Sequence, residues 1–264
     1  MRGDRSGPDT SGLSAALGEL ASRDRIAVGV DFDGTLAPFV VRPMDARPLP
    51  GGTEALRALA QCPGVTVAVV SGRQLEALAE LTGIRPGERI VLIGSHGAEW
   101  STGHDDASLL DATQRNLLAA LTAEAEAIVT RHEGARLEHK PAAVAVHTRG
   151  LPGEVSSAAL RATAELADRY PGAHPLPGKE VLELSVLTTG KGNALTTLAK
   201  ESGADATCYL GDDVTDERAF AALDPAGGDV TIKVGEGDTA AAFRVGEPAD
   251  VVGVLRELLG RRSR

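Results

Sequence analysis

Two aspartates in the segment GVDFDGTLAPF, residues 29–39, directly follow an apolar stretch of strand character. Asp31 and Asp33 stand two residues apart, and Gly34 and Thr35 break the strand immediately after them. Burying carboxylates at the end of a strand costs free energy unless water or a cation contacts them. The segment therefore indicates either a capped loop in water or a site where a cation lies between carboxylates.

Three further segments carry side chains that suit the same chemistry. They are VVSGR at 69–73, TGKGNAL at 189–195 and LGDDVTDE at 210–217. Each of the four segments alone has an ordinary interpretation, as an Asx turn, a helix N-cap, a helix start or a solvated acidic loop. Their joint placement argues against these interpretations, because three of them follow strand-like apolar runs and GKG opens the helix that leads into another run.

Together these residues could perform phosphoryl transfer. Asp31 and Asp212 can hold one Mg²⁺, whose charge offsets the repulsion between a carboxylate nucleophile and a phosphate. A carboxylate can attack phosphorus and form an aspartyl phosphate, which divides the reaction into two easier steps. Ser71 and the helix N-terminus after it can bind phosphate oxygens, and Lys191 supplies a positive charge. Asp33 can protonate the leaving oxygen and later accept a proton from water.

The remaining sequence predicts an α/β fold that would bring these groups together. Helical patterns at 51–61 and 73–83 separate apolar runs that are continuous rather than alternating, as in a parallel sheet covered on both faces. The predicted strands are residues 25–30, 65–70, 89–94, 206–211 and 229–234. This order predicts a doubly wound parallel sheet, in which functional groups gather beyond the carboxyl ends of the strands.

The alternation breaks between residues 101 and 186. A helix at 109–132, two short strands around Pro141, a second helix at 153–170 and a strand at 179–184 predict an αββαβ unit inserted into the core. We therefore expect residues 1–24 to form a tail, loose over 1–12, and a short helix. Residues 25–104 and 186–264 should form the core, and residues 105–185 should form a smaller α/β cap domain.

Composition restricts the class of protein. The 264 residues are 42% hydrophobic and 24% charged, which is typical of a soluble globular protein. A net charge of −10 argues against a nucleic-acid binder, although a local pocket can still attract an anionic substrate. No targeting signal or membrane-spanning run is visible. The two cysteines, Cys62 and Cys208, form no disulfide framework or zinc motif. We expect a cytoplasmic monomer without nucleic-acid or membrane partners.

The four motifs resemble, in order, those of the haloacid dehalogenase (HAD) superfamily of phosphotransferases. This resemblance implies a Rossmann-like HAD phosphatase core in which the first aspartate of the opening motif is the nucleophile and the second is the acid/base. It also implies a Mg²⁺ cofactor, bound in part through the backbone carbonyl of the second aspartate. The predicted catalytic residues are Asp31, Asp33, Ser71 and Lys191, the metal-binding residues are Asp31, Asp33 and Asp212, and the supporting residues are Asp213 and Asp216.

A larger set of segments, including GSHGAEW, LEHKPAAVAVHTR, GKEVLEL and IKVGEGDTAAAFRV, resembles the trehalose-6-phosphate phosphatase family over about residues 26–260. This resemblance implies hydrolysis of trehalose 6-phosphate to trehalose and phosphate. In that family an E-x-K pair, an arginine on the next strand and a K-x-x-x-E pair in the cap bind the glucose hydroxyls. The implied substrate-binding residues are Glu138, Lys140, Arg149, Lys179 and Glu183, with Arg73 as a charge in the crevice.

Other functions remain open at this point. One is a related sugar phosphatase, acting on sucrose phosphate or mannosyl-3-phosphoglycerate; others are a phosphomutase and a catalytically silent sugar-phosphate-binding regulator. The intact set of catalytic aspartates and lysine favours an enzyme over a silent regulator. The sequence departs from the family in the segment ELSVLTTGKG, which lacks an Arg-Pro pair, so the loop before Lys191 is expected to differ. His96 and Glu99 could line the crevice or brace a turn between core and cap.

Overall fold

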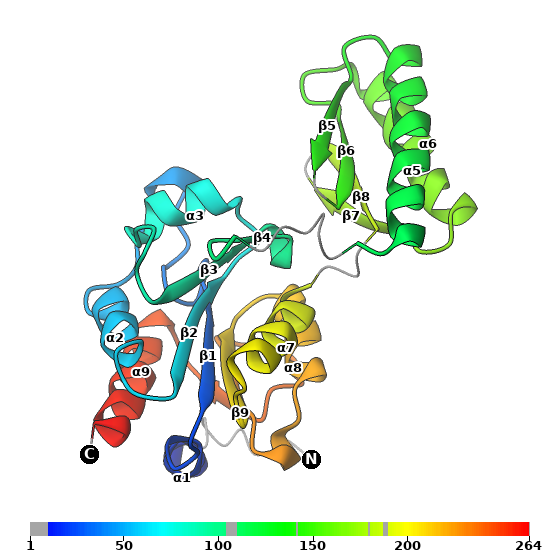
Figure 1. Ribbon diagram of the computed structural model, residues 1–264. Coiled ribbons are helices and arrows are strands. Elements are labelled where there is room, and N and C mark those ends of the chain that lie inside the picture. The colour runs from blue at the N-terminus through cyan, green and yellow to red at the C-terminus, as the bar shows by residue number, and fades with distance from the viewer. Residues whose placement is uncertain (1–9, 104–109, 141, 179, 187–189, 264) are drawn as a thin grey trace, which may run out of the picture. The chain divides into compact units, whose positions relative to one another are not determined.

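The computed structural model describes residues 10–103, 110–140, 142–178, 180–186 and 190–263 of the chain. The chain divides into two compact units, shown in Figure 1. The larger unit comprises Met1–Gly103 and Gly190–Arg264, and the smaller unit comprises His104–Thr189. Among the described residues, none of the helices combines the length and the apolar character that a membrane-spanning segment requires.

The larger unit is built around a seven-stranded sheet in the order β11-β10-β9-β1-β2-β3-β4. Neighbouring strands run parallel except at the β3–β4 pair. The strands are β1 Ile26–Asp31, β2 Val65–Val70, β3 Ile90–Gly94, β4 Glu99–Trp100, β9 Ala206–Gly211, β10 Val230–Val234 and β11 Phe243–Val245. The predicted doubly wound α/β class and all five predicted core strands are confirmed, whereas the short edge strands β4 and β11 were not predicted.

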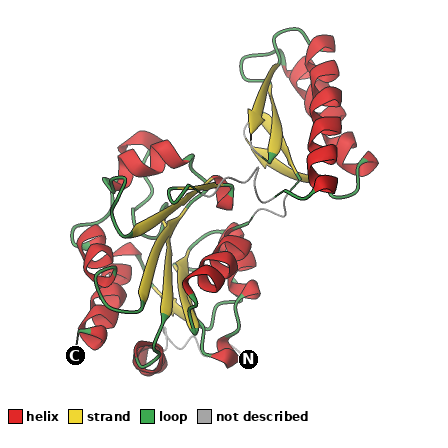
Figure 2. Ribbon diagram, viewed as in Figure 1, coloured by secondary structure: helices red, strands yellow, loops and turns green. Residues whose placement is uncertain are grey.

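Helices cover both faces of this sheet, as Figure 2 shows. One face packs against helices α1, α2, α3 and α9, and the other packs against α7 and α8. The helices are α1 Thr10–Ala21, α2 Gly52–Leu59, α3 Leu75–Thr82, α7 Lys191–Ser202, α8 Val214–Ala222 and α9 Pro248–Arg262. Helix α1 begins three residues earlier than predicted, and the rest of the predicted tail, residues 1–9, lies outside the described residues.

The order of the strands brings the loops that carry the predicted site residues to one edge of the sheet. From β1 the chain continues on one side through β2 and β3, and later adds β9 and β10 on the other side of β1. The loops after β1 and β9 therefore diverge at the carboxyl edge of the sheet, which is where doubly wound folds bind ligands. Every residue of β1 is buried, so its last residue, Asp31, is fixed at this edge by the core.

The smaller unit is a four-stranded antiparallel sheet, in the order β5-β6-β8-β7, whose one face is covered by two helices. The elements are α5 Ala112–Arg131, β5 Arg136–Lys140, β6 Ala143–His147, α6 Gly153–Arg169, β7 His174–Gly178 and β8 Val181–Ser185. The prediction of αββαβ is thus wrong by one strand. The segment HPLPG holds two prolines, which argue against a central strand but are tolerated in β7 because it lies at the edge of the sheet.

The two cysteines are free. Cys208 lies in the middle of β9 and is buried, and that burial raises the pKa of its thiol to about 12. A thiol that stays protonated is a poor nucleophile, so Cys208 acts as a small core residue. Cys62 is only partly buried.

Candidate active site

Two carboxylates meet at the carboxyl ends of β1 and β9. Asp31 is the last residue of β1 and is 3% exposed, and Asp212 directly follows β9 and is half-buried. Gly34 lies between the two loops with a φ of +79°, and a Cβ at this position would overlap the Asp212 carboxylate. The glycine of the DFDGT motif is therefore required both by its backbone conformation and by the close approach of Asp212.

Lys191 neutralises part of this negative charge. It is the first residue of α7 and is 4% exposed, and its Nζ donates hydrogen bonds to Asp31 Oδ1 at 2.6 Å and to Asp216 Oδ1 at 2.7 Å. Burial alone would lower the pKa of Lys191, but the attraction of these two carboxylates outweighs it and raises that pKa above its usual value. Lys191 is therefore a fixed positive charge beside Asp31.

Asp216 is the centre of the buried hydrogen-bond network. It is fully buried, and its Oδ1 accepts a further hydrogen bond from the Tyr209 hydroxyl at 2.6 Å. Its Oδ2 accepts from the backbone N–H groups of Asp212 at 3.0 Å and Asp213 at 2.9 Å. The residue predicted as a support thus fastens the first turn of α8 to the end of β9. Asp213, the other predicted support, is exposed and caps the N-terminus of α8.

Lys233 belongs to this site and was not singled out from the sequence. It lies in β10, is 6% exposed, and its Nζ donates hydrogen bonds to the backbone carbonyls of Asp212 and Val234. A lysine within the apolar strand VTIKV was the available signal, because a buried ammonium group needs acceptors. Lys233 adds positive charge directly behind the Asp212 loop.

The carboxyl groups suit a divalent cation. Burial raises the pKa of Asp31 well above its usual range, Lys191 opposes that rise, and the carboxylates of Asp216 and Asp212 add to it. Burial and then Asp216 likewise raise the pKa of Asp212. Carboxylate oxygens of Asp31, Asp212 and Asp216 lie within 4.8 Å of one another. Four donors already occupy the carboxylate of Asp216. Asp31 and Asp212 are therefore the two carboxylates that can turn towards Mg²⁺.

Asp33 is held by Arg73 instead of joining that cluster. The guanidinium forms a forked salt bridge, with Nε 2.6 Å from Asp33 Oδ2 and Nη2 2.7 Å from Oδ1. This pairing raises the pKa of Arg73, whose guanidinium also lies 5.5 Å from the centre of the Phe32 ring. The predicted crevice charge is therefore a partner of the predicted acid/base, and Asp33 is not a member of the cluster that Asp31, Asp212 and Asp216 form.

Ser71 follows β2 and is 1% exposed. Its Oγ accepts a hydrogen bond from the Arg73 backbone N–H at 3.1 Å, which fixes the hydroxyl within the turn. Helix α3 begins only at Leu75 with Gln74 as its N-cap residue, so Ser71 is not a cap. This leaves a buried hydroxyl in the loop at the carboxyl edge of the sheet, where it can meet a phosphate.

The loop after β3 is braced against the loop after β2. Ser95 and His96 both adopt the left-handed conformation, with φ of 47° and 56°, which is strained for residues other than glycine. Glu99 Oε2 accepts hydrogen bonds from Ser95 Oγ at 2.5 Å and from the Leu75 N–H at 3.1 Å. Glu99 is therefore a brace within the larger unit, whereas the His96 ring lies beside Gly72.

Three of the predicted sugar-binding residues share one face of the sheet in the smaller unit. Lys140 Nζ donates a hydrogen bond to Glu183 Oε2 at 2.5 Å, and Glu138 Oε2 lies 2.7 Å from His147 Nε2. Strand pairing places Glu138 and Glu183 on either side of Ala145. This face is opposite to the one that the helices cover, because the alternate residues of β6 and β8 form the core of the unit.

Of the other two sugar-binding residues predicted in the smaller unit, only Arg149 lies among the described residues. Arg149 is exposed in the turn after β6 rather than on a strand, and Lys179 lies outside the described residues, as do residues 187–189 of the loop before Lys191. His147 was missed. Its signal was the alternation of AVAVH, which places His147 on the face opposite to Val144 and Val146.

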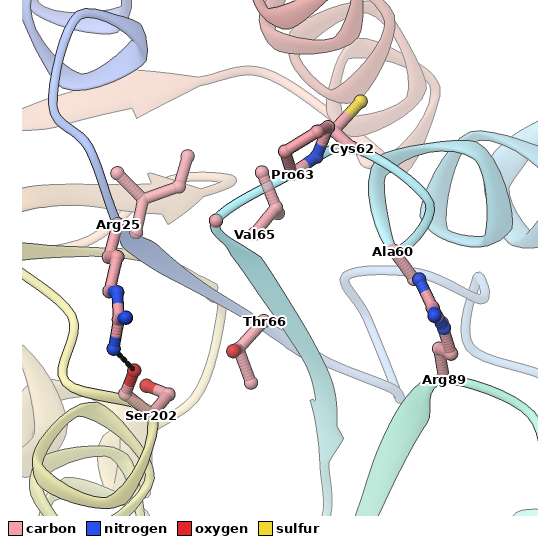
Figure 3. Close-up of a pocket in the computed structure, with 10 residues that line it drawn as sticks. Arg25, Ala60, Cys62, Pro63, Val65, Thr66, Arg89 and Ser202 are labelled. Atoms are coloured by element: carbon pink, nitrogen blue, oxygen red, sulfur yellow. Dashed lines mark hydrogen bonds between the residues drawn. The ribbon is translucent and has the colours of Figure 1, made fainter.

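A separate cavity lies at the opposite, amino-terminal edge of the larger sheet (Figure 3). It has a volume of about 440 Å³ and is lined by residues including Arg25, Cys62, Thr66, Arg89 and Ser202. Arg25 Nη1 there donates a hydrogen bond to the Ser202 carbonyl at 3.5 Å. None of the predicted site residues belongs to its described lining, so the carboxylate site is distinct from this cavity.

The fold and the site define a class of protein before any relative is considered. A doubly wound sheet with aspartates at the ends of adjacent central strands, a buried lysine bound to the first of them and an inserted α/β unit is typical of the HAD superfamily of phosphotransferases. The profile described as trehalose-phosphatase matches residues 29–248. The chain therefore belongs to the trehalose-phosphatase family.

The chain is also similar to individual curated proteins and to solved structures. The chain is 39% identical to the trehalose-phosphate phosphatase of Mycobacterium avium, covering 92% of this chain and 64% of the relative. It is 35% identical to an uncharacterized glycosyl hydrolase of Mycobacterium tuberculosis, covering 95% of this chain and 19% of the relative. The structure of Aspergillus fumigatus trehalose-6-phosphate phosphatase matches with a TM-score of 0.68 and 26% identity, covering 94% of this chain and 97% of that one. The chain thus spans less than two thirds of the length of these two curated relatives.

Proposed function

We propose that this chain is a Mg²⁺-dependent phosphatase that hydrolyses trehalose 6-phosphate to trehalose and phosphate. The observation that carries the proposal is the buried Asp31–Lys191–Asp216 network beside Asp212, in a chain of the trehalose-phosphatase family. In this proposal the larger unit is the phosphatase core, the smaller unit is the cap, and the protein acts as a cytoplasmic monomer on a small molecule, without nucleic-acid or membrane partners.

The first step is attack by Asp31 on phosphorus. Lys191 binds Oδ1 of Asp31 and leaves the second oxygen to form the new O–P bond. The bond between phosphorus and the sugar oxygen breaks, and Asp33 donates a proton to that leaving oxygen. Ser71 and the backbone N–H groups of its loop bind the phosphate oxygens during the transfer.

The second step restores the enzyme. A water molecule attacks the phosphorus of the aspartyl phosphate, and Asp33, now a carboxylate, accepts its proton. The O–P bond to Asp31 then breaks and phosphate leaves. Arg73 holds the Asp33 carboxylate in one orientation through both of its oxygens, so the acid/base must release one of these contacts to reach the substrate.

Asp31, Asp212 and the backbone carbonyl of Asp33 would hold the Mg²⁺. The ion would supply the positive charge that lets a carboxylate approach a phosphate dianion. The raised pKa values of Asp31 and Asp212 support this assignment, because they express the cost of holding charged carboxylates in a buried site beside Asp216 without a cation.

The smaller unit would bind the sugar. Glu138, Lys140 and Glu183 offer charged acceptors and donors on one face, and such groups form strong hydrogen bonds with hydroxyls. His147 joins them through Glu138. Arg149 and Lys179 remain predicted contributors.

The experiment is phosphate release from a panel of sugar phosphates with Mg²⁺ and with excess chelator. The panel contains trehalose 6-phosphate, sucrose 6-phosphate, mannosyl-3-phosphoglycerate, glucose 6-phosphate and p-nitrophenyl phosphate. We expect the highest kcat/KM for trehalose 6-phosphate, loss of activity in chelator and recovery when Mg²⁺ is restored. A higher kcat/KM for another sugar phosphate would contradict the assignment of trehalose 6-phosphate as the substrate. Full activity in metal-free protein would contradict the assignment of Mg²⁺ as the cofactor.

A further inference from the structure

The large apolar side chains that remain exposed belong to two segments that directly follow, in sequence, the loops carrying the proposed catalytic carboxylates. Among the residues that the structure describes, these side chains are Phe39, Val40, Val41, Met44 and Val214. The first four lie in the segment that follows the DFDGT motif, and Val214 directly follows Asp212 and Asp213. Scattered apolar residues need no explanation, but a group confined to the rim of a site indicates a surface that binds something.

Phe39 is the member of this group nearest to the chemistry. Its side chain is 73% exposed, yet one edge of its ring packs against the backbone of Gly34. A Cβ on Gly34 would lie 2.7 Å from Phe39 Cε2 and would also overlap the Asp212 carboxylate. The ring edge and that carboxylate are therefore neighbours on the same side of Gly34, while most of the ring remains free to meet a ligand.

The segment before Phe39 is firmly anchored. The Leu36 N–H donates to the Asp31 carbonyl at 3.2 Å, and the Ala37 N–H donates to the Phe32 carbonyl at 2.8 Å. Leu36 and Ala37 are fully buried in the core of the larger unit. Phe39 therefore starts from a turn that is fixed to the same strand end as Asp31, which limits where its ring can lie.

Because the ring edge adjoins Gly34 and Asp212, a ligand whose phosphate meets the Asp31–Asp212 site has its nearby atoms within reach of this ring. In trehalose 6-phosphate the phosphate is carried on the exocyclic C6 of a glucose unit, and the pyranose that begins one carbon further on has hydroxyls around its edge and apolar C–H groups on its faces. An aromatic ring offers a large apolar surface with little rotamer entropy to lose, and binding sites commonly combine such a surface with a few polar groups. A short acyclic phosphate ester has no ring face to cover.

We propose that Phe39 is a specificity-determining residue that packs against the C–H face of the pyranose ring carrying the phosphate. This inference rests on the proposed function and extends it, because it gives the larger unit its own part in recognising the sugar. The charged residues of the smaller unit would bind hydroxyls, whereas Phe39 would select for a ring next to the phosphate.

The test compares a cyclic with an acyclic substrate in three variants. Phe39→Ala should lower kcat/KM for trehalose 6-phosphate about tenfold, as expected for one lost contact of roughly 1.4 kcal/mol, while glycerol 3-phosphate changes less than about twofold. Phe39→Trp should retain activity on trehalose 6-phosphate, because it keeps an aromatic face. Asp45→Asn, an exposed residue of the same segment that is not part of this apolar group, should leave both substrates unchanged.

Two kinetic outcomes would overturn the inference. An equal loss on both substrates would show that Phe39 only supports Gly34 and Asp212, and no loss on either would show that the ring is not contacted. If the wild-type chain does not hydrolyse trehalose 6-phosphate but does hydrolyse glucose 6-phosphate, the proposed function fails. The role of Phe39 is then tested by the ratio of kcat/KM for glucose 6-phosphate to kcat/KM for glycerol 3-phosphate in the same variants.

A binding measurement covers the case without turnover. Calorimetry on Asp31→Asn with trehalose 6-phosphate should give an affinity that the added Phe39→Ala change weakens about tenfold. Glycerol 3-phosphate should show no such difference. Equal affinities for trehalose 6-phosphate with and without Phe39, or no binding to either protein, would reject the contact.

Discussion

The two units of the chain hold their charged groups in opposite ways. In the larger unit the side chains of Lys191 and Asp216 are 3% and 0% exposed, and every oxygen of Asp216 is bound. In the smaller unit the side chains of Lys140 and Glu183 are 21% and 14% exposed, and each forms a single pair with the other. Buried ions are fixed and perturb one another's pKa values, whereas partly exposed ions exchange partners at less cost.

This difference matches the two tasks of the proposed reaction. A carboxylate that attacks phosphorus must be oriented before the substrate arrives, because reorientation during the reaction would add to the barrier. Groups that bind hydroxyls can instead pair with each other while the site is free, as Lys140 and Glu183 do. Substitutions in the buried network should therefore affect every substrate and the fold, and those on the open face should affect only the sugar.

The largest expected effect is that of Asp31→Asn. The amide keeps the size of the side chain but is a very poor nucleophile, so turnover of every phosphate ester should fall by about 10⁴-fold or more. Asp45→Asn, an exposed aspartate of the same unit, is the control. The measurement is phosphate release, with circular dichroism to verify the fold. Substantial activity in folded Asp31→Asn would contradict the mechanism.

Asp216→Ala should cause the largest loss of stability. It removes four hydrogen bonds and leaves Lys191 buried beside Asp31 with one partner fewer, so the free energy of unfolding should fall by about 3–5 kcal/mol. Urea denaturation of this variant and of Glu183→Gln provides the measurement. Equal midpoints for the two variants would show that the buried network is no more important to the fold than the open face.

Substitutions on the open face should separate the sugar from the phosphate. A hydrogen bond between a charged group and a hydroxyl contributes about 1.5–3 kcal/mol, so Glu183→Ala or Lys140→Ala should lower kcat/KM for trehalose 6-phosphate about ten- to a hundredfold. Activity on p-nitrophenyl phosphate should hardly change. The control is Glu126→Gln, an exposed glutamate on helix α5 of the same unit. Equal losses of kcat/KM on both substrates would instead show that these residues support the fold.

The same contrast explains how much of the molecule could be predicted from its sequence. Continuous apolar runs predicted the five core strands, and parallel strands must bring their carboxyl ends together, so the meeting of Asp31 with Asp212 followed from topology. The apolar alternation of β6 and β8 is a sequence signal of the same kind, because it indicates which residues face away from the core.

Side-chain pairing could not be predicted in the same way. Arg73 and Asp33 are separated by 40 residues, and their salt bridge depends on the conformations of two loops and two flexible side chains. Lys233 donates to a backbone carbonyl, and the sequence does not encode such an acceptor in any residue type. Strand β7 was missed because its prolines are compatible with an edge position that only the assembled sheet defines.

The smallest expected effect is that of an exposed ion pair that belongs to neither site. Arg57 Nε lies 2.7 Å from Glu88 Oε2, with side chains 42% and 25% exposed. A double-mutant cycle of Arg57→Met and Glu88→Gln should give a coupling of about 0.2–1 kcal/mol in the free energy of unfolding. Hydrogen bonds from Arg57 and from the Arg85 N–H hold the pKa of Glu88 below its usual 4.5, so the coupling should be complete above that value and disappear as pH falls through the lowered pKa. A coupling energy at pH 7 as large as the loss of unfolding free energy in Asp216→Ala would show that burial does not determine how much the ion pairs of this protein contribute to stability.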